Sequence, residues 1–230
     1  MKFLLLLSLI ALVSALPPPS ESIDKRAESF VCPSGATKCQ TRFKKASLDI
    51  EVKDQYSLGK IYGDDGKELP VYIVNIDGQS PGNACNAQKF IVNNYNNDNY
   101  FNKDGYIVLA RGSGYDRDQV LRGYSCSSSS YQRDEFPPNS ANSIMEKVTD
   151  ISVLCITASD NEIDGCNLSR FFTGTAAKKA TGSSQCVTND NTHYHPNQAS
   201  STPRNFQIEQ GEKFAVVINT KNSNGCKAYT

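Results

Sequence analysis

The stretch Tyr131-Gln132-Arg133-Asp134-Glu135-Phe136-Pro137 decides the fold and the chemistry that we expect of this chain. It places an arginine beside two carboxylates, and the cluster Ser159-Asp160-Asn161 follows after one apolar segment. Carboxylate and amide oxygens are ligands of hard divalent cations, and an arginine can pair with a phosphate oxygen. Such a set is typical of metal-assisted phosphodiester hydrolysis. The alternative interpretation is a solvated charged turn before a proline.

Strand geometry divides the roles within this motif. Side chains alternate between the two faces of a strand, so Asp134 and Glu135 would point in opposite directions. We expect Asp134 to be the general base or a metal ligand, and Arg133 to neutralise a phosphate oxygen. Asn161, with Asp160 or Asp164, would hold the cation at the start of a helix, although Asp160 could instead cap that helix.

The amino-terminal residues are typical of an exported precursor. Lys2, an apolar run and Val13-Ser14-Ala15 predict a signal peptide over residues 1–15. A proline-rich spacer follows and ends in Lys25-Arg26, which predicts a propeptide over residues 16–26. The apolar run is shorter than the roughly 20 residues that cross a membrane. We therefore expect a secreted, extracellular protein with no membrane partner.

The composition limits the class of protein. All eight cysteines lie after Arg26, and an even number in an exported chain predicts a disulfide framework, whose pairing stays open. The sequence holds no Cys-x-x-Cys pair and only two histidines, which argues against a zinc site. Lys and Arg together number 24, and so do Asp and Glu. Because stable nucleic-acid binders usually carry a basic excess, we expect any nucleic acid to be bound transiently and with a metal.

The chain after the dibasic pair predicts one domain of mixed α+β class. Residues 27–68 would form an N-terminal extension with a short edge strand, residues 69–230 the main domain, and residues 176–203 a long polar insertion within it. β-Branched and apolar runs predict strands over residues 69–76, 105–110, 148–157 and 212–220. Helical spacing of apolar residues predicts a helix over residues 83–93, and the asparagine-rich tract 93–102 is typical of a loop.

Taken in order, these motifs resemble the NucA/NucB family of secreted deoxyribonucleases. The family signature is Tyr-Asp-Arg-Asp-Glu-aromatic-Pro, then a strand that ends in Ser-Asp-Asn with a glycine after it, and a closing Gly-x-x-apolar strand. Residues 131–137, 159–165 and 211–218 are similar to these three parts. An opening strand and helix at residues 72–83 extend the resemblance to residues 69–220.

The resemblance implies a compact ββα-metal nuclease core with a mixed or antiparallel sheet, which would cut DNA without strong sequence preference. It implies one divalent cation, and the hard oxygen ligands favour Mg²⁺ or Mn²⁺. It also implies a site without a histidine base, in which Asp134 takes that role. Glu135, Arg133 and Asn161 are the further functional residues that carry over. We expect DNA as the partner of a monomeric enzyme.

The chain departs from the family pattern at three places. Gln132 replaces an acidic residue, Pro138-Asn139 replaces small apolar residues, and Cys166-Asn167-Leu168-Ser169 lies where the family's helix begins. The last segment also predicts N-glycosylation at Asn167. Arg111 and Arg117, in a glycine- and serine-rich segment, are the predicted substrate-binding cations. Two alternatives stay open: a secreted binding or effector protein with a degenerate nuclease fold, and a secreted ribonuclease.

Overall fold

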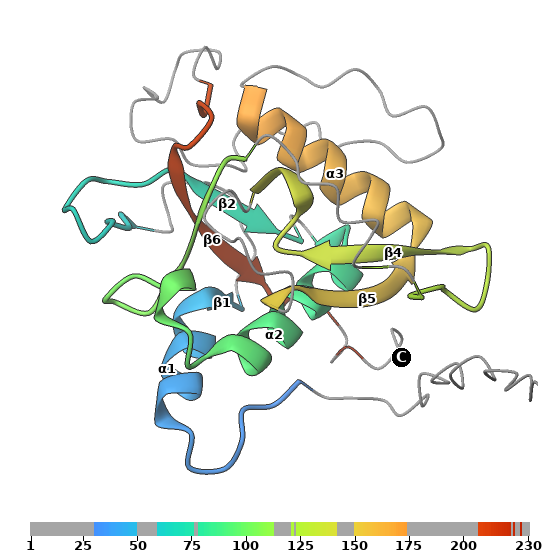
Figure 1. The fold of residues 1–230 in the computed structure, drawn as a ribbon, viewed down its shortest axis with the longest axis horizontal. Helices are drawn as coiled ribbons and strands as arrows, with labels where there is room; N and C mark the ends of the chain where they lie inside the picture. Colours follow the sequence, from blue (N-terminus) through green and yellow to red (C-terminus); the bar gives the residue numbers. More distant parts are fainter. Residues whose placement is uncertain are drawn as a thin grey trace, which may run out of the picture.

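The structure is a computed structural model (Figure 1), and it describes residues 30–49, 59–75, 78–112, 121, 123–141, 150–173, 207–221, 223 and 226. The predicted signal peptide, the propeptide, Arg117 and the insertion at residues 176–203 lie outside these residues. Within the described residues, helices, parallel strands and antiparallel strands occur together, so the predicted mixed α+β class is confirmed. No helix among these residues combines the length and the hydrophobicity that a membrane span requires.

A four-stranded sheet forms the apolar centre of the molecule (Figure 1). Its strands are β1 (Ser47–Leu48), β2 (Val71–Val74), β3 (Ile107–Ala110) and β6 (Lys213–Asn219). β6 is the central strand, and it pairs in parallel with β1 and β2 and antiparallel with β3. The apolar, largely β-branched run of β6 is buried on both faces, as expected for a strand that is covered on both sides.

The two faces of this sheet build two apolar clusters. Tyr72 and Phe214 belong to the larger cluster, which also contains residues of helices α2 (Pro81–Asn94) and α3 (Ala158–Thr173). Val71 belongs to the smaller cluster on the opposite face. Because neighbouring residues of a strand point to opposite faces, the hydroxyl of Tyr72 lies on the helix side of the sheet, where the candidate site is found.

The segment before β2 is part of this core. Helix α1 (Thr37–Ala46), which lies in the predicted N-terminal extension, leads directly into β1 and packs against α2. Arg42 of α1 stacks on Phe101, with its guanidinium carbon 3.9 Å from the ring centroid, and it also pairs with Asp98. The residues expected to form an extension thus contribute a helix and a strand to the main body.

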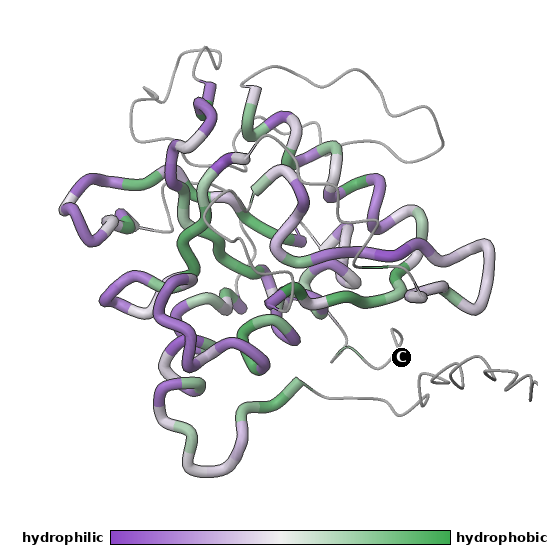
Figure 2. Tube along the Cα trace, in the orientation of Figure 1, coloured by the Kyte–Doolittle hydropathy of each residue, from purple (hydrophilic) through white to green (hydrophobic). Residues whose placement is uncertain are grey.

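A hairpin followed directly by a helix forms the second part of the fold. β4 (Tyr131–Phe136) pairs antiparallel with β5 (Ser152–Thr157), and the short 3-10 helix η4 (Asn139–Ala141) follows β4. β5 ends at Thr157 and α3 begins at Ala158. α2 lies against both strands of the hairpin and against α3. Figure 2 shows β4 as a hydrophilic segment, whereas β2 and β6 are largely hydrophobic.

Disulfides join these parts of the fold. The bonded pairs are Cys32 with Cys39 at α1, Cys85 of α2 with Cys226 near the C-terminus, and Cys126 with Cys155 of β5. Cys166 of α3 is disulfide-bonded as well. The predicted disulfide framework is therefore confirmed for these residues, and such a framework fits an extracellular protein.

The asparagine-rich tract at residues 93–102 contains helix as well as loop. α2 continues into it, and the short 3-10 helix η3 (Asp98–Tyr100) follows. Tyr100 is 2% exposed, its ring packs edge-on against Phe90, and its hydroxyl donates to Asp150. The polar composition of this tract is typical of a loop, but its aromatic residues belong to the core.

Candidate active site

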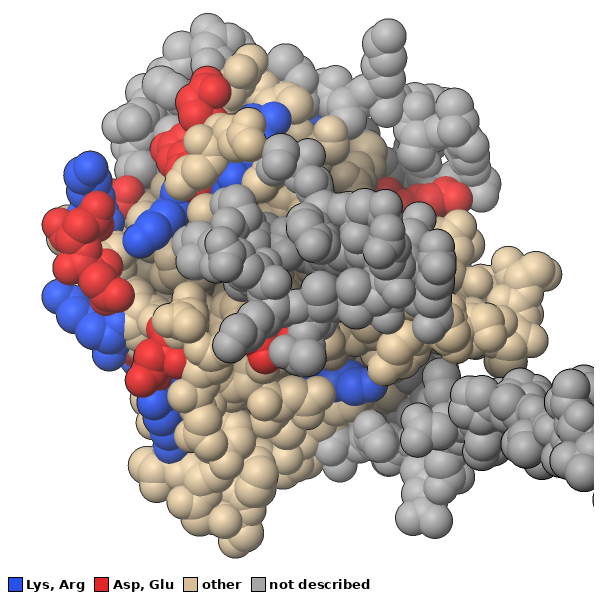
Figure 3. Space-filling model, in the orientation of Figure 1, with Lys and Arg blue, Asp and Glu red and all other residues tan. Residues whose placement is uncertain are grey.

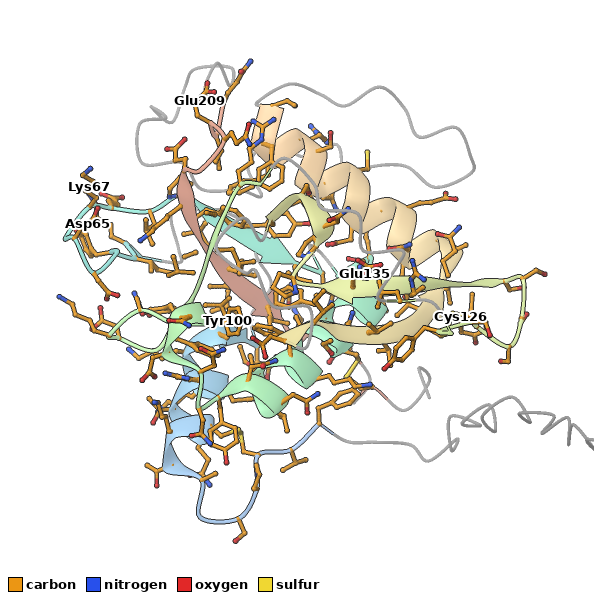
Figure 4. All side chains as sticks on the ribbon, viewed as in Figure 1. Asp65, Lys67, Tyr100, Cys126, Glu135 and Glu209 are labelled. Atoms are coloured by element: carbon orange, nitrogen blue, oxygen red, sulfur yellow. A yellow bond between two sulfur atoms is a disulfide. The ribbon has the colours of Figure 1, made fainter. Side chains whose placement is uncertain are left out.

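The motif residues of β4 divide between the two faces of the strand. Asp134 is 8% exposed and faces α2, and Phe136 on the same face packs against Phe90 of α2. Arg133 and Glu135, which is labelled in Figure 4, lie on the opposite face and are paired through Nε and Oε1 at 3.3 Å. The structure thus separates Asp134 from the two other predicted catalytic residues, as the period of a strand requires.

Two asparagines of α2 hold the Asp134 carboxylate. Asn83 donates from Nδ2 to Asp134 Oδ1 at 3.0 Å, and Asn86 donates from Nδ2 to Oδ2 at 2.7 Å. The carbonyl oxygen of Asp134 also accepts from Asn86 Nδ2, at 3.1 Å. Asn83 and Asn86 are nearly one helical turn apart, so both point to the same side of α2. Each carboxylate oxygen therefore has its own amide donor.

The environment of Asp134 changes its protonation. Burial raises the pKa of Asp134 from 3.8 to about 6, because a buried carboxylate loses the water that stabilises its charge. Hydrogen bonds from Asn86, the Glu135 backbone and Asn83 oppose this rise, whereas the charge of Glu135 adds to it. With a pKa of about 6, Asp134 is largely ionised at neutral pH and still accepts a proton readily, as a general base must.

The start of α3 brings a second carboxylate into the interior. The Thr157 hydroxyl accepts from the Asp160 backbone N–H at 3.2 Å, so the helix cap is the residue just before the helix rather than Asp160. The Asp160 carboxylate instead accepts from the Gly82 backbone N–H, at 3.1 Å from Oδ2. A Cβ at Gly82 would lie 2.8 Å from the Ile156 side chain and 2.9 Å from Asp160 Oδ2. Glycine is therefore required for this close approach of α2 to α3.

A third buried carboxylate, Asp164, lies one turn after Asp160. Its Oδ1 accepts from the Tyr72 hydroxyl of β2 at 2.8 Å. Burial, and then the charge of Asp134, raise the pKa of Asp164 to about 7, and the charge of Asp160 acts in the same direction. Burial likewise raises the pKa of Tyr72 well above its ordinary value. Asp134, Asp160 and Asp164 thus form one electrostatically connected cluster.

Asn161 lies at the outer edge of this cluster. Its Nδ2 donates to Gln132 Oε1 at 3.0 Å, and Gln132 is exposed on the same face of β4 as Asp134. Gln132, which stands where the NucA/NucB pattern has an acidic residue, therefore accepts a hydrogen bond from Asn161, a predicted metal ligand. This exposed pair joins β4 to α3.

Arg111 and Asn167, two other predicted site residues, pack within the described structure. Arg111 donates to the carbonyl oxygens of Ile208 and, at 3.4 Å, of Phe172, and its guanidinium lies 5.3 Å from the Phe172 ring centroid. This end of α3 is about 18 Å from Asp160 along the helix axis, so the structure does not bring Arg111 to the carboxylate cluster. Asn167 is 2% exposed within α3, which leaves no room for a glycan on the folded helix.

The cluster offers oxygen ligands of the kind that a hard cation takes. The described part of the chain holds no group of three or more His, Cys, Asp or Glu side chains that could bind a metal ion. Mg²⁺, however, is commonly held by one or two carboxylates with water completing its shell. The buried Oδ1 atoms of Asn83 and Asn86 have no hydrogen-bond partner among the described residues. The predicted ligands Asp134, Asp160 and Asn161 likewise offer side-chain oxygens, and oxygen donors of this kind fit Mg²⁺ or Mn²⁺.

Three residues of this cluster have no role in the sequence prediction. Tyr72 belongs to a predicted strand, Asn83 is the first residue of the predicted helix 83–93, and Asn86 lies within that helix. The spacing of the two asparagines predicts that they lie on the same side of the helix, but it does not identify their partner. The apolar run around Tyr72 gives no sign of its hydrogen bond.

No family model, no curated protein and no solved structure matches this chain. The resemblance to the NucA/NucB family therefore rests on residues 131–137, 159–165 and 211–218, and it stays a prediction. We base the functional proposal on the geometry around Asp134.

Proposed function

We propose that the chain is a secreted, metal-dependent endonuclease that hydrolyses phosphodiester bonds in DNA without strong sequence preference. The observation that carries this proposal is the Asp134 carboxylate, which is buried, is held by two neutral amides and has a pKa raised to about 6. It lies on the first strand of a hairpin that runs directly into the helix bearing Asp160 and Asn161. This strand-strand-helix order supports the ββα-metal core that the family resemblance implies.

Asp134 would act as the general base. A base is most effective when its pKa lies near the ambient pH, because it is then ionised before the reaction and binds the proton during it. Its two amide partners orient the carboxylate and reduce its basicity less than an ion pair would. In the reaction, Asp134 takes one proton from the attacking water, whose oxygen bonds to phosphorus as the ester oxygen leaves.

The cation would be held where α3 begins. Asp160 and Asn161 are adjacent in the first turn of the helix, and Asn161 bridges to the strand that carries Asp134. The Gly82 backbone N–H keeps the Asp160 carboxylate in a fixed orientation there. A bound Mg²⁺ or Mn²⁺ supplies positive charge beside the phosphate. These oxygen donors, rather than nitrogen or sulfur, favour such a cation.

The two described arginines with predicted phosphate- or DNA-binding roles are engaged within the fold. Basic and acidic residues are equal in number, and on the face drawn in Figure 3 both kinds are intermingled along one edge of the molecule. Arg133 is paired with Glu135, and Arg111 donates to main-chain carbonyls. We therefore expect few phosphate contacts and a shallow dependence of binding on salt concentration.

One observation favours a second candidate, a secreted binding or effector protein that keeps the fold without turnover. Both carboxylate oxygens of Asp134 are hydrogen-bonded, its side chain is largely buried, and Gln132 stands where the family has an acid. In this candidate the polar cluster is structural. A ribonuclease is the remaining alternative, since the same phosphodiester chemistry applies to RNA.

Cleavage of supercoiled plasmid tests the proposal against both alternatives. The protein would be the chain from Ala27 onward with its disulfides formed, assayed in Mg²⁺ or Mn²⁺ with and without EDTA, and with a mixed-sequence RNA in parallel. We expect nicking and then linearisation of the DNA, and loss of activity in EDTA and in the variant Asp134→Asn. Undiminished cleavage in excess EDTA contradicts the metal dependence. An intact plasmid supports the binding protein, and cleavage of RNA alone supports the ribonuclease.

A further inference from the structure

The two asparagines that hold Asp134 are themselves deeply buried. Asn83 is 3% exposed and Asn86 is 0% exposed. Their side chains make three hydrogen bonds to Asp134, which reach both carboxylate oxygens and the carbonyl oxygen. Burial of an amide is unfavourable unless its donors and acceptors find partners. We therefore compare the hydrogen bonds that the Asn83 and Asn86 side chains donate with those that their carbonyl oxygens accept.

Their carbonyl oxygens have no partner among the described residues. Asn83 Oδ1 and Asn86 Oδ1 are both buried without a hydrogen bond. Asn102 is similarly buried, yet it is satisfied at both ends, since Nδ2 donates to the Tyr62 carbonyl at 2.7 Å and Oδ1 accepts from the Tyr106 amide at 2.9 Å. Both the donor and the acceptor of the Asn102 side chain are thus hydrogen-bonded. In Asn83 and Asn86 only the donor group is hydrogen-bonded, and its partner is Asp134.

The surroundings of α2 fix both asparagines relative to Asp134. Pro81 is the first residue of the helix, and Gly82 allows so close an approach to α3 that a Cβ would lie 2.9 Å from Asp160 Oδ2. Cys85, between the two asparagines, is bonded to Cys226. A helix that is held at its first turn and by a disulfide presents residues i and i+3 in a fixed geometry.

We propose that Asn83 and Asn86 are positioning residues that hold the Asp134 carboxylate in the orientation required for proton transfer. This role rests on the function proposed above. Donors on two different oxygens prevent the carboxylate from rotating about its Cβ–Cγ bond, so that one lone pair stays directed at the water to be deprotonated. Neutral amides achieve this without the positive charge of Arg or Lys, which would make the carboxylate a weaker base.

Replacing each asparagine by leucine tests this role, because leucine has a similar size and no donor. Steady-state cleavage of a fluorescent DNA duplex at saturating Mg²⁺ would give kcat and KM for Asn83→Leu, Asn86→Leu and the control Asn102→Leu. Loss of a hydrogen bond to a charged group predicts a fall in kcat of about 10-fold or more for both α2 variants, largest for Asn86→Leu. KM should change by less than about twofold, since neither asparagine needs to touch the DNA. Asn102→Leu should lose thermal stability and keep its kcat.

The possible results separate this proposal from the proposed function. Unchanged kcat in both α2 variants, or a rise in KM in place of a fall in kcat, overturns the positioning role. An equal fall in kcat for Asn102→Leu also overturns it, because the effect would then follow from stability. If the leucine variants show no cooperative melting transition, Asn83→Ser and Asn86→Ser replace them with the same expected direction. If the wild-type protein does not cleave DNA, or Asp134→Asn cleaves as fast, the proposed function itself fails.

Discussion

The four-stranded sheet and the hairpin that leads into α3 bury their side chains in opposite ways. In β6 every residue after Lys213 is buried, and the run Phe214-Ala215-Val216-Val217-Ile218 is apolar throughout. β4 instead buries Asp134 beside Phe136 and carries an ion pair on its other face. The buried apolar side chains of the first region add to stability, whereas the second region places a carboxylate where its charge is unfavourable.

This difference is consistent with the proposal that the apolar sheet serves stability and the hairpin region serves function. Burial of a large apolar side chain contributes about 1.5–3 kcal/mol, but a buried carboxylate lowers stability unless its partners offset the lost hydration. Here the hydrogen-bond donors are neutral: two asparagine amides at Asp134, a backbone N–H at Asp160 and a tyrosine hydroxyl at Asp164. Unfavourable burial of this kind is typical of functional sites.

The largest expected effect tests the hairpin side of the comparison. Asp134→Asn keeps the shape of the side chain but cannot accept the water's proton, so the cleavage rate should fall by about 10²- to 10⁴-fold. Thermal stability should change little, because removal of the buried charge offsets the loss of one of the two hydrogen bonds that the carboxylate accepts. Plasmid cleavage and a melting curve followed by circular dichroism measure the two quantities. An unfolded variant, or one that cleaves normally, would instead assign Asp134 to the structural core.

The next effect tests the apolar side. Phe214 is 0% exposed and packs against Phe171 and Phe172, with ring centroids 5.3 and 5.5 Å away. Phe214→Ala leaves a cavity, and the free energy of unfolding should fall by about 3–5 kcal/mol. Urea denaturation measures this loss. The folded fraction should cleave DNA at the wild-type rate, because the Asp134 cluster is not touched. Wild-type stability of the variant would contradict the central role of β6.

The smallest of the three effects is a pH dependence that the apolar sheet cannot produce. A carboxyl group whose pKa is raised by folding binds its proton more tightly in the folded state, so it stabilises the fold at low pH. For Asp134 and Asp164, with pKa values of about 6 and about 7 against 3.8, this contribution is complete below about pH 4. It is lost as the pH rises through these folded values.

The variant Asp164→Asn isolates this contribution, because an amide resembles the protonated carboxyl group. The groups that face Asp164 are Tyr72, Asp134 and Asp160. We expect the variant to be more stable than the wild type at about pH 8, by an amount on the order of 2 kcal/mol, and to approach it at about pH 4. Melting curves across this range measure the difference. A difference that does not vary with pH would show that Asp164 does not titrate in the folded protein.

The apolar sheet could be predicted because its signal is local. The runs at residues 69–76 and 212–220 predict strands, and the structure has β2 and β6 at residues 71–74 and 213–219. α1 could not be predicted in this way, because its sequence is mostly polar and its packing depends on a distant contact, that of Arg42 with Phe101. The local sequence pattern therefore identifies the strands of the sheet but not helix α1.

The candidate site could be predicted only in part. The alternation of a strand predicts that Asp134 and Glu135 face apart, as they do. Tyr72, Asn83 and Asn86 could not be assigned, because their carboxylate partners lie 48 to 92 residues away in the chain. A hydrogen bond over such a separation leaves no pattern in one sequence. The guanidinium of Arg111 lies beside Phe172, near the end of α3 and away from this cluster, and its substrate-binding role stays a prediction.

The direct junction between β5 and α3 determines how this part of the chain can change in length. Thr157 is the last residue of the strand and Ala158 the first of the helix, so no loop residue separates them. One inserted or deleted residue there would turn the helix by about 100° around its axis and carry Asp160 and Asp164 away from Asp134 together. A substitution at the exposed Ser159 leaves this rotational phase unchanged. The length of this junction is therefore constrained more strictly than the identity of an exposed residue such as Ser159.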